Sequence, residues 1–151
     1  MNKTLLVSMG FLSFLFGSCA KQSSEPRAAD QPASKFHAGQ VWAFNTPPGQ
    51  PNAKLTILSV ENGGKLGTIV HIALSGVSYG NGQTKIQHLP FAESAVEKSV
   101  TALESESGPI PDFAEGYRLW REAFDAGKAG VFTITVAEAY DAVTSIARDR
   151  K

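Results

Sequence analysis

The sequence has few of the residues from which most metal centres and nucleophilic active sites are built. It has one cysteine, Cys19, among 151 residues, which excludes an intrachain disulfide and a multi-cysteine metal site. Its three histidines, His37, His71 and His88, are far apart in the chain, whereas zinc ligands often come as close pairs. The short motifs of nucleophile elbows, phosphate-binding loops and zinc proteases are also absent. No catalytic constellation is therefore visible, and we expect neither a metal nor a cofactor.

The chain also lacks a surplus of one charge and a long hydrophobic run. It carries 14 basic and 14 acidic residues, and this balance gives no support for binding to nucleic acid. The most apolar stretch, residues 5–16, is interrupted only by Ser8, Gly10 and Ser13. A helix of about a dozen residues spans roughly 18 Å, well short of the ~30 Å hydrocarbon core of a bilayer. This stretch is therefore not expected to be a transmembrane helix.

The first 18 residues have the order of a secretory signal peptide. A short positive start with Lys3 is followed by the apolar stretch and then by the small residues Gly17 and Ser18. A signal peptide over residues 1–18 is the resulting prediction.

The end of this signal resembles the lipobox of bacterial lipoproteins. The residues are Phe16-Gly17-Ser18-Cys19, with phenylalanine where the family usually has leucine. The resemblance implies diacylglycerol on the Cys19 sulfur, cleavage after Ser18 and acylation of the new amine, for example by palmitate. Several acyl chains together give stable membrane attachment. The alternative is an ordinary secretory signal in which Cys19 has no special role.

The residues after Cys19 predict where the protein resides. Ala20 stands where an aspartate commonly retains Gram-negative lipoproteins in the inner membrane. In a Gram-negative host we therefore expect attachment to the outer membrane, facing the periplasm. Residues 19–35 contain two prolines and no aromatic or branched apolar side chain, which predicts a lipidated, disordered tether before one domain over residues 36–151.

The first half of this domain predicts an antiparallel meander. Strands are expected over residues 41–44, 54–61, 67–77 and 84–88, where branched apolar residues concentrate. Glycine-rich turns separate the later strands, and three prolines interrupt residues 45–52. The curved meander can also close into a small barrel.

The second half predicts helices. Pro90 suits the first position of a helix whose apolar face includes Val96, Val100 and Leu103 and which ends before Gly108. Asp112 is the expected N-cap of a second helix, and Thr135 with Glu138 forms a capping box for a third. A brief fifth strand is expected over residues 131–134. The fold class is therefore α+β, with four to five strands followed by about three helices packed on one face.

The second half also resembles small bacterial proteins. The resemblance covers residues 88–139, about a third of the chain, and it implies a recurring domain. It implies no activity, cofactor or catalytic residue.

Two groups of residues are candidate sites. His71, His88 and Glu93 are the catalytic candidates. In a hairpin centred on Asn81, however, the two histidines are not expected to pair with each other. The second group recurs at helical spacing and is either core or a binding face; its members are Phe113, Tyr117, Trp120 and Phe124.

The function most consistent with these features is that of a membrane-anchored envelope lipoprotein. Its domain is expected to be non-enzymatic and to bind another protein or support an envelope complex. The alternative is an enzyme or small-ligand carrier with a pocket that uses His71 and His88.

The lipid anchor is testable at Cys19. Replacement of Cys19 by serine removes the sulfur that accepts diacylglycerol, so Cys19→Ser should abolish palmitate labelling and partitioning into the detergent phase. Unchanged labelling of the Cys19→Ser chain would show that the membrane attachment has another origin.

Overall fold

The computed structural model describes residues 33–80 and 82–149, with side chains described as far as residue 146. The predicted signal peptide, the predicted lipidation site Cys19 and most of the predicted tether lie outside these residues. The first buried side chain of the described chain is Phe36, which is 2% exposed.

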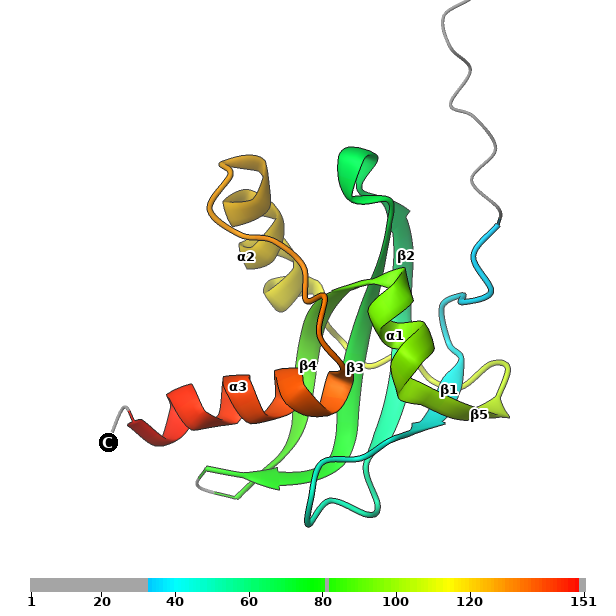
Figure 1. Ribbon diagram of the computed structural model, residues 1–151, viewed down its shortest axis with the longest axis vertical. Coiled ribbons are helices and arrows are strands. Elements are labelled where there is room, and N and C mark those ends of the chain that lie inside the picture. The colour runs from blue at the N-terminus through cyan, green and yellow to red at the C-terminus, as the bar shows by residue number, and fades with distance from the viewer. Residues whose placement is uncertain (1–32, 81, 150–151) are drawn as a thin grey trace, which may run out of the picture. The chain divides into compact units, whose positions relative to one another are not determined.

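The architecture is an antiparallel five-stranded sheet with helices, which confirms the predicted α+β class (Figure 1). The strands lie in the order β4-β3-β2-β1-β5, so the sheet is open, with β4 and β5 at its edges. The elements are β1 (Val41–Phe44), β2 (Lys54–Asn62), the 3₁₀ turn η1 (Gly64–Leu66), β3 (Thr68–Tyr79), β4 (Gln83–Ala92), α1 (Glu93–Ser99), β5 (Val100–Ser105), α2 (Ala114–Asp125) and α3 (Val136–Asp149).

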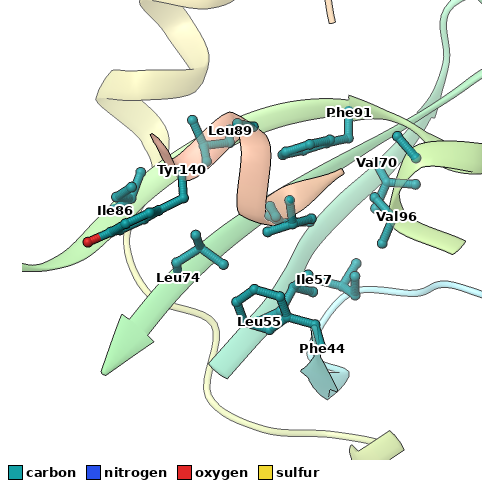
Figure 2. Packing of buried hydrophobic residues seen from close by; sticks show 14 of the residues in the cluster. Phe44, Leu55, Ile57, Val70, Leu74, Ile86, Leu89, Phe91, Val96 and Tyr140 are labelled. Carbon is teal, nitrogen blue, oxygen red and sulfur yellow. The ribbon is translucent and has the colours of Figure 1, made fainter. Parts of the chain in front are cut away.

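The main core lies on one face of the sheet, beneath α1 and α3. Alternate residues of β3, namely Val70, Ile72 and Leu74, point into it and are fully buried. Figure 2 shows Val96 of α1 and Tyr140 of α3 packed over these strands. Branched and aromatic side chains at a period of two on the strands therefore meet helical stripes at a period of three to four.

The opposite face of the sheet is covered by α2. The intervening residues of β3, Ile69 and His71, point to this face and are fully buried, with Tyr117 and Trp120 of α2 packed against the His71 ring. The helices are thus divided between the two faces, whereas the sequence placed all three on one. The apolar residues at the intervening β3 positions are what make a second covering layer necessary.

The fifth strand is not where the sequence placed it. Residues 100–105, expected to continue the first helix, form β5 and pair with β1, with Phe44 opposite Val100. At the end of α1 the Ser99 hydroxyl donates to the Ala95 carbonyl and accepts from the Val136 amide, which ties this end of α1 to the start of α3. The predicted strand over residues 131–134 is reduced to a single parallel bridge from Phe132 to Phe91.

Pro90 also has a different role from the one predicted. It belongs to the edge strand β4, and α1 begins only at Glu93. Proline is tolerated here because an edge strand can do without one amide donor. The Pro90 carbonyl still accepts a hydrogen bond from the Phe132 amide at 2.9 Å.

The caps of the later helices differ in their agreement with the sequence. The box at α3 is formed, because the Glu138 carboxylate accepts from the Thr135 amide at 2.9 Å and the Thr135 hydroxyl accepts from the Glu138 amide at 3.4 Å. At α2 the N-cap is Phe113, which makes no side-chain cap hydrogen bond, so Asp112 is not the N-cap that the sequence predicted. The Asp112 carboxylate instead accepts from the Ala114 amide at 3.0 Å from one position further back, while Glu115 pairs with Arg118. Both helices begin where an acceptor side chain precedes the first turn.

Gly76 in β3 allows a close backbone approach that a Cβ atom would prevent. Its φ is +67°, and a Cβ there would lie 2.3 Å from the Asn52 carbonyl oxygen. Gly80 has a φ of +55° with open space around it, so it is the matched control. In urea unfolding, Gly76→Ala should lose roughly 1–3 kcal/mol more stability than Gly80→Ala. Equal losses would mean that backbone strain alone governs Gly76.

Candidate functional site

The two histidines that were expected to lie apart are in direct contact. His71 of β3 is opposite Pro90, and His88 lies two residues before Pro90 on the same face of β4, which makes it a diagonal neighbour of His71. Two register irregularities in this hairpin, between Ile72 and Leu74 and between Ser75 and Tyr79, shift the pairing away from the symmetric one assumed from the sequence. The two ring planes are nearly parallel with centroids 5.1 Å apart, and Nδ1 of His71 lies 2.9 Å from Nε2 of His88.

A carboxylate extends this pair into a chain of polar side chains. Glu61 of β2 places Oε1 at 3.3 Å from Nε2 of His71. The other oxygen of Glu61 accepts a hydrogen bond from the Tyr117 hydroxyl at 2.9 Å. Arg121, one helical turn after Tyr117, donates to Oε1 at 3.3 Å and also pairs with Asp125. Three strands and α2 therefore contribute to one network, which we call the Glu61–His71–His88 chain.

Aromatic rings cover this chain and exclude water from its centre. His71 has no exposed surface, and the ring of Trp120, which is 8% exposed, lies 4.8 Å from it. Phe113 stacks on the outer side of His88 with ring centroids 6.2 Å apart. Gly116 lets α2 approach so closely, because a Cβ there would lie 2.9 Å from Cβ of His88.

The geometry favours one arrangement of the ring protons. In the described part of the chain, Nε2 of His71 makes no well-aligned hydrogen bond, yet its nearest charged atom is a carboxylate oxygen. A nitrogen lone pair facing that oxygen would be repelled, whereas an N–H would be attracted. With its proton on Nε2, His71 accepts at Nδ1 from Nε2 of His88, and Nδ1 of His88 is the remaining acceptor.

Burial keeps both histidines neutral at pH 7. Loss of hydration lowers the pKa of His71 below its ordinary 6.5, although the Glu61 carboxylate opposes this shift. Burial and then the neighbouring His71 lower the pKa of His88 to about 4. Burial and the bond to Glu61 raise the pKa of the Tyr117 hydroxyl. With both histidines neutral, the charge beside them comes from the Glu61 carboxylate and from Arg121, which is paired with it.

A hollow of ≈ 590 Å³ opens beside this network. It lies between the end of β2 and the segment that enters α2, and its lining is mainly apolar. Glu61 and Tyr117 belong both to its wall and to the buried network. The other lining residues are Ser59, Val60, Ile110, Pro111, Asp112, Phe113 and Ala114.

The structure separates the sequence candidates. His71 and His88 lie together, whereas Glu93 is in α1, which packs on the main core of the opposite face. Of the aromatic stripe, Trp120 is core, while Phe113 and Tyr117 also line the hollow. Phe124 stacks on Trp120 at 4.8 Å.

Glu61 and Arg121 were not identified from the sequence. Glu61 ends the second predicted strand and looks there like a solvated charge. Arg121 lies four residues after Tyr117, and this spacing on one helical face was the available signal. Their meeting depends on the pairing of β2 with β3, which places Glu61 opposite Ile69.

Among residues 33–80 and 82–149, no group of three histidine, cysteine or acidic side chains is placed to hold a metal ion. No helix within the same residues is both long and apolar enough to cross a bilayer.

No family model, curated protein or solved structure matches this chain.

The contribution of the aromatic cover is testable at Trp120. Its ring is buried on His71, and its Nε1 donates to the Gly130 carbonyl at 2.8 Å. Trp120→Ala should therefore destabilise the fold by about 3–5 kcal/mol. The control Leu119→Ala, at a position 53% exposed on the same helix, should change stability by less than about 0.5 kcal/mol. A wild-type melting temperature for Trp120→Ala would contradict a core role.

Proposed function

We propose that this protein is a lipid-anchored envelope lipoprotein whose folded domain binds another protein without catalysing a reaction. The anchor rests on the lipobox-like residues that end at Cys19. The observation that supports the binding role is the apolar hollow beside β2, with exposed apolar residues at its edge. In a Gram-negative host the anchor would place the domain at the outer membrane, facing the periplasm.

The hollow has the chemistry of a protein-binding surface rather than of a reaction centre. Ile110 is 46% exposed at its rim, next to Pro111 and Phe113. Apolar side chains that stay exposed at the edge of a concave surface gain free energy when a partner covers them. Ser59 and the carboxylates at the rim can accept hydrogen bonds from that partner and set its orientation.

The alternative, catalysis or small-ligand binding through the two histidines, is less well supported. A catalytic base must lie within hydrogen-bond distance of its substrate. His71 has no exposed surface, and its ring nitrogens face His88 and Glu61. His88 borders a shallow polar hollow of ≈ 340 Å³, which His71 does not line. The histidine pair is better explained as the polar centre of the contact between α2 and the sheet.

The binding role is testable by photocrosslinking from the hollow. A photoreactive amino acid at position 110 should give a discrete crosslinked partner in intact cells, whereas one at position 119, on the outer side of α2, should not. Burial of an exposed isoleucine by a partner contributes about 1.5–3 kcal/mol to binding. Ile110→Asp removes this contribution and should weaken capture of that partner roughly 10- to 100-fold.

Leu119→Asp is the matched control, because Leu119 is exposed but does not line the hollow. The same adducts from positions 110 and 119, or full capture by Ile110→Asp, would refute a partner site in the hollow.

A further inference from the structure

The wall of the hollow and the buried histidines belong to one network. Tyr117 and Glu61 line the hollow and share a hydrogen bond of 2.9 Å. Glu61 also lies 3.3 Å from His71, whose other nitrogen contacts His88. Any change in the charge of the histidine pair therefore acts on two residues that shape the hollow.

The charged and titratable groups around the pair come from each element packed against it. β2 supplies Glu61, and α2 supplies Tyr117 and Arg121, with Asp125 balancing Arg121. From β4, Lys85 lines the polar hollow beside His88. The pair thus has one carboxylate as its direct anionic neighbour, and Arg121 already shares that carboxylate.

An added proton would be poorly accommodated in this setting. The free acceptor is Nδ1 of His88, and its protonation would create an imidazolium between the rings of His71 and Phe113. Desolvation opposes a charge at this place. Movement of α2 away from the sheet would hydrate the imidazolium and would leave the main core, which is built with α1 and α3, intact.

We propose that proton uptake by the His71–His88 pair loosens α2 from the sheet and so disassembles the partner-binding hollow in acid. This regulation rests on the proposed binding role of the hollow. Phe113, Ala114 and Tyr117 form the α2 side of its wall, so the hollow loses that side when α2 moves.

The sign of the pH dependence follows from the lowered pKa of each histidine. With α2 docked, the pair binds fewer protons than free histidine, whose pKa is 6.5. Docking is therefore fully favoured above pH 6.5 and weakens as the pH falls towards the pKa of about 4 for His88. In this range the docking equilibrium falls by up to about tenfold per pH unit for each histidine.

Hydrogen exchange on the full chain tests this proposal without a partner. Amide protection, corrected for the intrinsic effect of pH on exchange, is compared at pH 7 and pH 5 for α2 and α3. Protection of α2 should fall at least about tenfold relative to α3. A parallel loss in both helices would be global acid unfolding, and unchanged α2 protection would mean that the pair does not titrate with docking; either result overturns the proposal.

His88→Gln is the diagnostic variant, because an amide can still donate to Nδ1 of His71 but does not titrate. It should retain α2 protection at pH 5, and His37→Gln, at an exposed histidine that pairs with Glu106, should behave like the wild type. Acid loosening that persists in His88→Gln would overturn the proposal.

If His88→Gln does not fold, the wild-type comparison still decides the question. A failure of the photocrosslinking experiment would refute the proposed partner site but would not change the hydrogen-exchange result. The two experiments therefore distinguish a failure of the binding role from a failure of the acid-induced loosening of α2.

Discussion

The burial of His71 beneath α2 is the constraint on which the second face of the sheet depends. A buried imidazole needs hydrogen-bond partners, and an unmet buried polar group costs about 1–3 kcal/mol. His88 is the partner of Nδ1, the Glu61 carboxylate lies 3.3 Å from Nε2, and Tyr117 and Arg121 hold Glu61 in place. The position of α2 is thus fixed by a polar network within an aromatic cover, whereas α1 and α3 pack on the sheet mainly through apolar side chains.

The strands of the first half and the last two helices could be predicted because their local signals agree with the tertiary structure. The β1 strand has the predicted bounds, 41–44, and the capping box at Thr135 marks the start of α3. The prediction of helix for the segment after Ser99 was wrong. The apolar spacing of this segment fits a helix, but the free edge of β1 is available and the segment pairs with it as a strand. Local periodicity cannot predict a strand that forms because it pairs with another strand distant in the sequence.

The candidate site was harder to predict for the same reason. A shift of the hairpin register by one residue decides whether His71 and His88 lie on the same face of the sheet, since side chains alternate between the two faces. The sequence does not determine the register to within one residue. Glu61 and Arg121 became part of the site only when β2, β3 and α2 were assembled. The sequence therefore supplied the histidines as candidates, but their shared environment is a property of the fold.

The central claim is that both histidines are neutral at pH 7 and that His71 is fully buried, which makes the pair the polar centre of the contact between α2 and the sheet rather than a reacting group. Two-dimensional ¹H–¹⁵N NMR of the histidine rings at pH 7 tests this most directly, because ring nitrogen shifts distinguish the two neutral tautomers from imidazolium. We predict that His71 and His88 are both neutral and both carry their proton on Nε2. A charged His88 at pH 7, or a His71 protonated on Nδ1, would contradict the account.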